Sequence, residues 1–75
     1  MLAIKMRRVD GYEIYEHAET LSEAVSFIEN EAINTAGDTW SGALDTIFPI
    51  YWRIINKTTA EQIAAGFVDE YGEIT

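Results

Sequence analysis

The chain of 75 residues contains no cysteine and a single histidine, His17. Disulfide bridges and thiolate metal sites are therefore excluded, and so is a metal centre built from several histidines. Because packing alone has to hold the domain together, the chain fits a reducing compartment. We expect a cytoplasmic location and no bound metal or cofactor.

Long apolar segments are also absent. No run approaches the roughly 20 apolar residues that span a bilayer. The N-terminal stretch, MLAIKMRRV, carries charges where a signal sequence would be apolar. We therefore expect a soluble protein without a targeting segment.

Basic residues are missing from the middle of the chain. No Lys or Arg occurs between Arg8 and Arg53, whereas the whole chain has 13 Asp and Glu residues and a net charge of -8. Direct binding to nucleic acid or to an anionic membrane needs clustered Lys and Arg, so neither is expected. A basic protein is the more natural partner.

The residues that are present suit one folded domain spanning residues 1–75. A chain of this length buries only about 60% of its unfolded surface, which leaves nothing for a second core. Apolar residues make up 48% of the chain and aromatic residues 12%. This is the composition of a globular domain rather than of a disordered acidic tail.

The start of the chain predicts a β-hairpin. Residues 2–9 alternate between apolar and polar side chains, as a strand with one buried face does. Asp10 and Gly11 follow, and this dipeptide is the strongest short signal for a hairpin turn. The second strand is predicted over residues 12–18.

A two-residue loop fixes the register of this hairpin so that paired positions sum to 21. Two cross-strand ion pairs are then expected, Arg8 with Glu13 and Lys5 with Glu16. The same register turns Tyr15 toward the helix, together with the apolar side chains of the first strand.

The clearest element is an amphipathic helix over residues 20–37. Thr20 followed by Glu23 has the spacing of a capping box, and Gly37 stands where a left-handed residue would end the helix. Phe27 and Ile33 flank the apolar stripe, so they either make a second contact or are covered by later residues. The stripe itself is predicted to face the core, and it consists of Leu21, Ala24, Val25, Ile28, Ala32 and Ala36.

Residues 38–49 break the helical pattern. Gly42 and Pro49 punctuate this segment, and a short helical turn is predicted over residues 43–48. Its large apolar side chains are expected to tuck under the sheet edge or against the main helix: Trp40, Leu44, Ile47 and Phe48.

The segment Ile50–Asn56 is the clearest strand, and its apolar character on both faces predicts a central place in the sheet. Two interpretations of the following residues stay open. Either a helix begins near Ala60, or residues 56–61 form a turn that leads into a strand over residues 62–69. The hairpin is favoured because Gly66 and its β-branched and aromatic neighbours weaken a helix.

Together these elements predict an α+β fold in the order β-β-α-β-β, with one main helix packed on a four-stranded antiparallel sheet. The acidic tail, residues 69–73, is expected to be solvated. A single helix leaves one sheet face bare, with Tyr12, Ile14 and one side of Ile50–Asn56 exposed. This face then needs cover from residues 38–49 or from a dimer partner.

No arrangement of residues indicates catalysis, and we expect a protein that is not an enzyme. Neighbouring carboxylates such as Glu29 and Glu31 point to different sides of a helix, so they do not form an acid–base pair. The five glycines are isolated, so a phosphate-binding glycine loop is absent. A nucleophilic triad would require His17 to meet a serine, and none of the candidates stands on a nucleophile turn: Ser22, Ser26 and Ser41.

The acidic surface carries the main functional hypothesis. Its carboxylates can match DNA phosphates and occupy the groove of a basic, nucleic-acid-handling protein. In size and acidity the chain is similar to the small phage inhibitors of restriction or CRISPR nucleases, which implies an acidic inhibitor or adaptor that acts as a DNA mimic. The predicted partner-binding residues are Glu13, Glu16, Glu23, Glu29, Glu31, Asp38, Asp45, Phe27, Ile33 and Trp40.

Two alternatives stay open beside this hypothesis. The acidity can serve solubility alone, because net charges of about 2 to 8 are ordinary for small domains. Alternatively, the chain is a small structural or homo-oligomeric protein with an apolar interface. That interface would use Phe27, Ile33, Trp40 and the bare sheet face.

Overall fold

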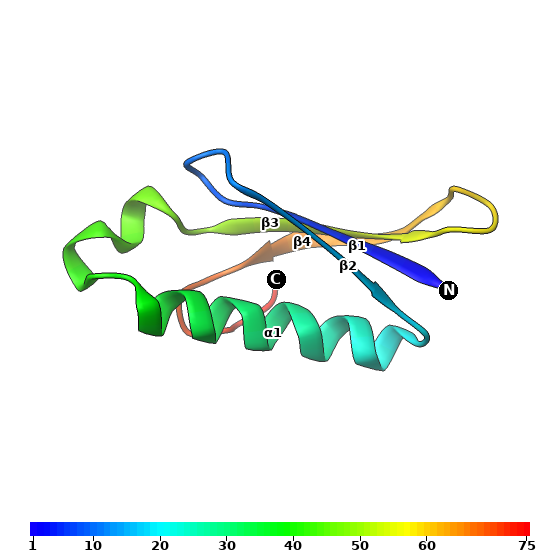
Figure 1. Cartoon of the computed structure of the whole chain (residues 1–75), viewed down its shortest axis with the longest axis horizontal. Helices are drawn as coiled ribbons and strands as arrows, with labels where there is room; N and C mark the ends of the chain where they lie inside the picture. The colour runs from blue at the N-terminus through cyan, green and yellow to red at the C-terminus, as the bar shows by residue number, and fades with distance from the viewer.

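The computed structural model describes the whole chain, residues 1–75, as four strands and one long helix (Figure 1). The predicted α+β fold and its β-β-α-β-β order are confirmed. The elements are β1 (Leu2–Arg7), β2 (Glu13–Ala18), α1 (Leu21–Asp38), the short 3-10 helix η1 (Ser41–Thr46), β3 (Ile50–Asn56) and β4 (Gln62–Val68).

All four strands form one antiparallel sheet in the order β2-β1-β3-β4. The central place predicted for β3 is therefore confirmed. Figure 1 shows α1 running along one side of the sheet, with no element over the other side. We call the uncovered side the open face, and its side chains come from alternate strand positions: Ala3, Lys5, Arg7, Glu13, Tyr15, His17, Tyr51, Arg53, Ile55, Ala65 and Phe67.

The core lies between the sheet and α1. Side chains at every fourth position of α1 meet alternate side chains of the central strands, as the two periodicities require. Leu21, which belongs to the predicted helix stripe, is exposed instead. The buried residues are all apolar: Ile4, Met6, Ala18, Ala24, Ile28, Ala32, Ile47, Phe48, Ile50, Trp52, Ile54 and Val68.

The N-terminus of α1 has the predicted capping box. The Glu23 N–H donates to Thr20 Oγ1 at 3.2 Å, and the Glu19 N–H donates to the Glu23 carboxylate at 3.2 Å. Each residue thus satisfies a backbone donor that the first helical turn leaves free. Neither α1 nor η1 combines the length and the apolarity that a membrane crossing requires.

The predicted end of the helix at Gly37 is wrong. Gly37 lacks the left-handed backbone that a terminating glycine adopts, and α1 continues through Asp38. Thr39 ends the helix with an extended backbone, and its hydroxyl donates to the Thr35 carbonyl at 2.6 Å. The side-chain bond of a threonine therefore does what a left-handed glycine was expected to do.

The loop between β1 and β2 is longer than the two residues predicted. The Arg8 N–H donates to the Tyr12 carbonyl at 2.9 Å, which closes a loop over residues 8–12. The Asp10 carboxylate accepts from the Arg8 guanidinium and from the Tyr12 N–H, both at 3.1 Å. These bonds to Asp10 favour the wider loop, and the predicted register is wrong by one residue.

The corrected register changes which side chains meet. Neither predicted ion pair forms, because Arg8 pairs with Asp10 at 2.5 Å and Lys5 lies opposite Tyr15. Tyr15 points to the open face rather than toward the helix. Ile14 takes the opposite direction and is half-buried on the helix side, so it does not contribute to the open face.

Residues 38–49 only partly follow the prediction. Ile47 and Phe48 are buried and Leu44 is half-buried against the core. Trp40 was expected to tuck in and instead is 78% exposed, with its ring lying over Gly42. The segment extends one end of the molecule and leaves the open face uncovered (Figure 1).

The hairpin between β3 and β4 is confirmed, and the alternative helix near Ala60 is wrong. The Asn56 N–H donates to the Glu61 carbonyl at 2.8 Å across the turn. Ala60 has φ of 61°, a left-handed conformation that glycine adopts more easily. The bonds of Asn56 therefore hold a turn that the residue at position 60 does not itself favour.

The acidic tail, residues 69–73, was expected to be solvated, and Tyr71 is 80% exposed, but the chain beyond it folds back onto β4. Thr75 and Phe67 exchange two backbone hydrogen bonds of 2.9 and 3.3 Å. The Asp69 carboxylate accepts from the N–H groups of Tyr71 and Glu73 at 2.9 and 3.0 Å, which turns the chain back. The tail therefore covers part of the β4 edge, where unpaired backbone groups would otherwise be exposed.

Candidate functional site

The sheet brings basic side chains together on the open face. Lys5 and Arg7 come from β1 and Arg53 from β3, and these two strands are hydrogen-bonded neighbours. Lys5 lies directly opposite Arg53 in the register, and Arg7 is two positions further along β1. Three of the five Lys and Arg residues of the chain thus form one cluster. This cluster exists only because strands distant in sequence pair.

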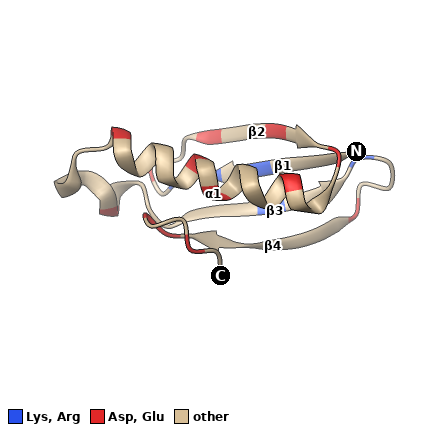
Figure 2. Ribbon diagram, turned by 90° about the horizontal axis from the view of Figure 1, so that it is seen from below, with Lys and Arg blue, Asp and Glu red and all other residues tan.

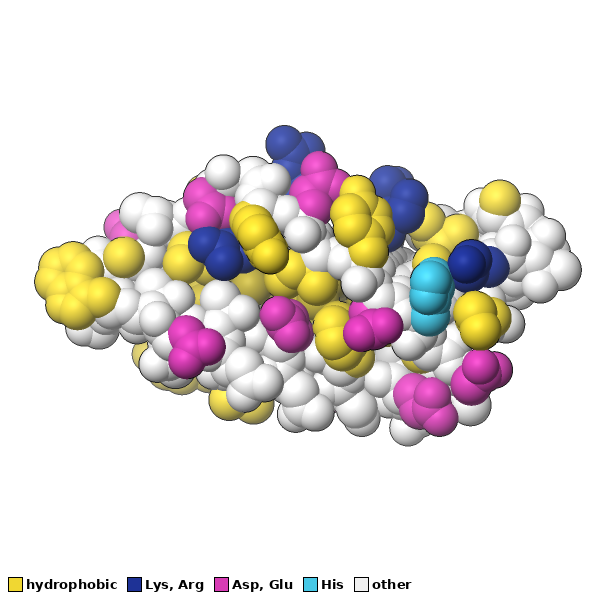
Figure 3. All heavy atoms as spheres, in the orientation of Figure 1, with side chains coloured by type: hydrophobic (Ala, Val, Ile, Leu, Met, Phe, Trp, Pro, Cys, Tyr) yellow, Lys and Arg dark blue, Asp and Glu magenta, His cyan; other side chains and the backbone are white.

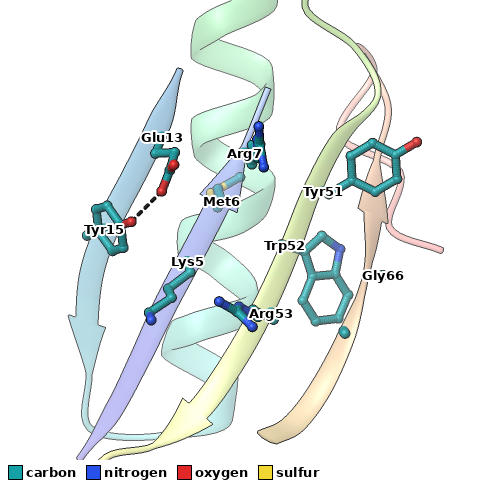
Figure 4. A pocket seen from close by; sticks show the side chains of 10 residues that line it. Lys5, Met6, Arg7, Glu13, Tyr15, Tyr51, Trp52, Arg53 and Gly66 are labelled. Carbon is teal, nitrogen blue, oxygen red and sulfur yellow. Dashed lines mark hydrogen bonds between the residues drawn. The ribbon is translucent and has the colours of Figure 1, made fainter. Parts of the chain in front are cut away.

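Aromatic side chains stand beside this basic cluster. Tyr15 on β2 and Tyr51 on β3 are 63% and 55% exposed, and both line a groove of ≈ 440 Å³ (Figure 4). Phe67 on β4 packs against Tyr51 edge to face, with ring centroids 6.3 Å apart. Figure 4 shows Lys5 and Arg53 between the two tyrosines, with α1 behind the sheet.

No carboxylate forms an ion pair with the basic cluster, although Glu13 lies opposite Arg7 in the register. The one ion pair of the chain joins Arg8 and Asp10 in the loop, away from the groove. Lys5 Nζ instead lies 5.9 Å from the centre of the Tyr15 ring, within reach of a cation–π contact. Glu13 is the single acid on the open face, and it is engaged by the Tyr15 hydroxyl, which donates to its carboxylate.

The hydrogen bond from Tyr15 to Glu13 changes the titration of the phenol. Because the carboxylate accepts the phenolic proton and carries a negative charge, it raises the pKa of Tyr15 above its ordinary value. In the loop the effect is opposite, since the hydrogen bond from Arg8 lowers the pKa of Asp10.

The acidic residues predicted for partner binding lie in more than one place. Glu13 is on the open face. Glu29 is on the side of α1 along which the tail runs, because Gly72 packs against Ile33 and the Glu29 backbone. Asp45 lies in η1, where it lines a separate hollow with two acids of the tail.

The other four predicted acids share one side of the molecule. Along α1, Glu23, Glu31 and Asp38 are spaced by eight and seven residues, so they fall on one stripe with Phe27. The tail follows β4 and covers the opposite flank of α1, so this stripe faces the β2 edge.

Strand β2 adds to this stripe. Glu16 is opposite the buried Ile4, so its side chain lies on the helix side of the sheet. We call Glu16, Glu23, Glu31 and Asp38 the acidic side. Figure 2 shows the acidic segments of α1 in front of the sheet, with the acidic segments of β2 beside the basic segment of β1. In Figure 3 a row of Asp and Glu side chains runs below most of the Lys and Arg side chains, and other acidic side chains lie among the basic ones at the top.

The three apolar residues predicted for a partner contact lie apart from one another. Phe27 is partly buried against the core. Ile33 is 52% exposed, although Gly72 of the tail covers part of it. Trp40 presents most of its ring to solvent at the end of the molecule, and Gly42 supports that ring from below.

His17 lies on the open face, and Lys57 is its side-chain partner, with Nζ 3.2 Å from Nε2. None of the three serines considered for a triad is hydrogen-bonded to it. Nowhere do three or more His, Asp or Glu side chains come together in a way that would hold a metal ion.

The basic cluster is the feature that the sequence prediction missed. The sequence does contain a pattern that indicates it. Lys5 and Arg7 alternate with buried residues, as do Tyr51 and Arg53, so each pair points to one face of its strand. The signal becomes useful only once β1 and β3 are known to be neighbours in this register, which the order of elements does not specify.

Comparison with known proteins is negative at each level: no family model, no curated protein and no solved structure matches the chain. Its function is therefore inferred from its own residues. The two features available for this are the acidic side and the open face.

Proposed function

We propose that the chain is a non-enzymatic inhibitor or adaptor that binds a basic, nucleic-acid-handling protein through its acidic side. The main support is that the carboxylates of the acidic side form no ion pair within the chain. Of 13 Asp and Glu residues, only Asp10 takes part in an ion pair. On the acidic side, Glu16 and Glu23 accept only backbone N–H groups, so no basic side chain of the protein itself competes with the Lys and Arg residues of a partner.

The dimensions of the acidic side suit a DNA mimic. From Glu23 to Asp38 the stripe advances about 22 Å along the helix axis, at about 1.5 Å per residue. One strand of duplex DNA presents phosphates about every 3.4 Å, so the stripe covers the length of about six to seven base pairs, with its acids about 10 to 12 Å apart. A partner that binds it releases counterions as it would on DNA, which makes association fast and salt-sensitive.

The separation of charges strengthens this proposal. The basic cluster lies on the open face, so its Lys and Arg side chains do not reduce the negative potential of the acidic side (Figure 3). Trp40 follows Asp38 by two residues and is well exposed. Tryptophan is prominent among the residues that dominate binding energy at protein interfaces, so Trp40 supplies the apolar anchor that charge alone lacks.

The test is capture of the partner from a lysate of the source cells with two variants of equal charge. The first removes three acids of the acidic side, E16Q, E31Q and D38N. The control removes three acids elsewhere, E29Q, E61Q and E73Q. Wild type and control should retain the same basic protein, the first variant should lose it at least about tenfold, and retention should fall steeply between 100 and 500 mM salt.

Circular dichroism melts of both variants establish that they are folded. Equal capture of the partner by the two variants would contradict the proposal, because binding would then depend on the total charge and not on the carboxylates of the acidic side. Capture that persists unchanged at high salt would contradict it as well, since the contact would not be electrostatic.

A further inference from the structure

The open face combines accessible aromatic rings with basic side chains that have no acidic partner. This combination is typical of surfaces that hold single-stranded nucleic acid, on which bases stack on rings and phosphates meet Lys and Arg. We propose that the open face binds single-stranded nucleic acid, independently of the acidic side. The residues that carry this contact are Tyr15, Tyr51, Phe67, Lys5, Arg7 and Arg53.

The register sets these groups in two rows across the sheet. Tyr15, Lys5 and Arg53 form one row, and Arg7 and Tyr51 belong to the next. With strands about 4.8 Å apart and about 3.4 Å per residue along each strand, the two tyrosines are about 12 Å apart on the diagonal. The basic side chains lie between them, where the backbone joining two stacked bases would pass.

The basic cluster is electrostatically unfavourable in the free protein. Lys5 and Arg53 lie directly opposite each other on neighbouring strands, and like charges in that position destabilise a sheet. An anion between them relieves this repulsion. Glu13 lies opposite Arg7 on this face, but it accepts the Tyr15 hydroxyl and forms no ion pair with the cluster.

The net charge of -8 does not prevent binding at moderate salt. Charges separated by more than about 10 Å are largely screened at 0.1 M salt. The acidic side lies across the sheet from the open face, whereas the basic cluster touches the ligand directly. The cluster therefore determines the local interaction, although the overall charge weakens it.

A second copy of the chain fits this face poorly. Two open faces in contact would bring two basic clusters together with only Glu13 from each copy to compensate, and Glu13 already accepts the Tyr15 hydroxyl. An acidic peptide would neutralise the positive charge of the cluster, but it has no flat rings to stack on Tyr15 and Tyr51. Single-stranded nucleic acid complements both features, because its phosphates neutralise the basic side chains and its bases stack on the exposed rings.

The test is fluorescence anisotropy with a labelled single-stranded DNA of eight nucleotides and mixed sequence, in 100 mM salt. Arg53→Gln should weaken binding about fivefold and Tyr51→Leu about tenfold, since they remove a phosphate contact and a stacking ring. Arg8→Gln and Tyr71→Leu are the matched controls, because they remove the same groups away from the open face, and should change binding less than twofold.

Two further measurements identify the ligand class. With three phosphate contacts, the plot of log affinity against log salt should have a slope of about -2, and about -1.4 for Arg53→Gln. A duplex of the same sequence should bind more weakly, because its bases are not free to stack.

The inference is overturned if the duplex binds as tightly as the single strand, if an eight-residue glutamate peptide binds in its place, or if no binding is detected at millimolar concentration. It is also overturned if the controls weaken binding as much as the open-face variants. The triple variant E16Q, E31Q and D38N separates this inference from the proposed function, because it should lose the basic protein and still bind the oligonucleotide.

Discussion

Single hydrogen bonds set the chemistry of several exposed side chains in this protein. The Tyr15 hydroxyl is tied to Glu13, and the Asp10 carboxylate is tied to Arg8 and to the Tyr12 backbone. The five-residue loop shifts the register of β2 and so turns Glu13 and Tyr15, which are two positions apart on one strand, toward the open face. A one-residue change in the register thus decides which side chains are available on the open face.

The first prediction concerns the Tyr15 phenol. Its pKa is raised by the hydrogen bond to Glu13, so this bond stabilises the fold below the phenol's unfolded pKa and is lost as pH rises through the folded value. Glu13→Gln should lower the Tyr15 midpoint in an NMR titration of ring carbons. Glu16→Gln, which removes an acid from the other face of β2, should leave it unchanged. A midpoint insensitive to Glu13→Gln would contradict the assigned cause.

The second prediction compares two isoleucines of α1. Ile28 is fully buried, whereas Ile33 is half exposed beside Gly72. Ile28→Ala should lower the free energy of unfolding by about 3 kcal/mol through lost burial and a cavity. Ile33→Ala should cost less than about 1 kcal/mol, because much less area is buried there. Urea denaturation measures both, and equal costs would mean that α1 is rotated from the orientation described.

Short sequence patterns predicted most of the helices and strands. How these elements are arranged depends on contacts between residues that are distant in sequence. The capping box at Thr20 and the weakening of a helix by Gly66 and its neighbours both act within a few residues, so the helix start and the second hairpin were predictable. The β1–β2 register was not, because it depends on how the Asp10 carboxylate bonds within the loop. Trp40 was also misjudged, since its ring rests on Gly42 instead of the core, and sequence pattern does not show this contact.

The third prediction concerns the backbone of the two hairpin loops. Ala60 has φ of 61° and Gly11 has φ of 94°, a region that strains residues with a Cβ. Ala60→Gly should raise the free energy of unfolding by about 1 kcal/mol, and Gly11→Ala should lower it by about 1 kcal/mol. Because a Cβ at Gly11 meets no atom within 4 Å, the second change tests backbone strain alone. Thermal melts with the opposite order of stability would contradict these loop conformations.

At the scale of the whole molecule, charge separation is the property that joins the two proposals. The acidic side and the basic cluster come from segments that alternate along the chain, and the strand order sorts them to different faces. Sequence composition predicted an acidic protein, but net charge alone could not reveal a basic region. The open face is therefore the part of the site that required three-dimensional information.

The fourth prediction follows from the excess of unpaired carboxylates. With 13 acids and one ion pair, repulsion between acids outweighs attraction in the folded state. Raising NaCl from 10 to 150 mM should therefore raise the melting temperature by a few degrees, since salt screens this repulsion. The triple variant E16Q, E31Q and D38N should show a smaller increase. A melting temperature that falls with salt would show that attractive pairs dominate.

The most direct test of the charge separation is NMR relaxation of the folded chain by small paramagnetic co-solutes of opposite charge. An anionic probe should relax protons near Lys5, Arg7 and Arg53 more strongly than a cationic probe does. The cationic probe should dominate along the acidic side, at Glu16, Glu31 and Asp38. If the cationic probe dominates on both faces, the net charge overwhelms the basic cluster and the account of two opposite faces is wrong.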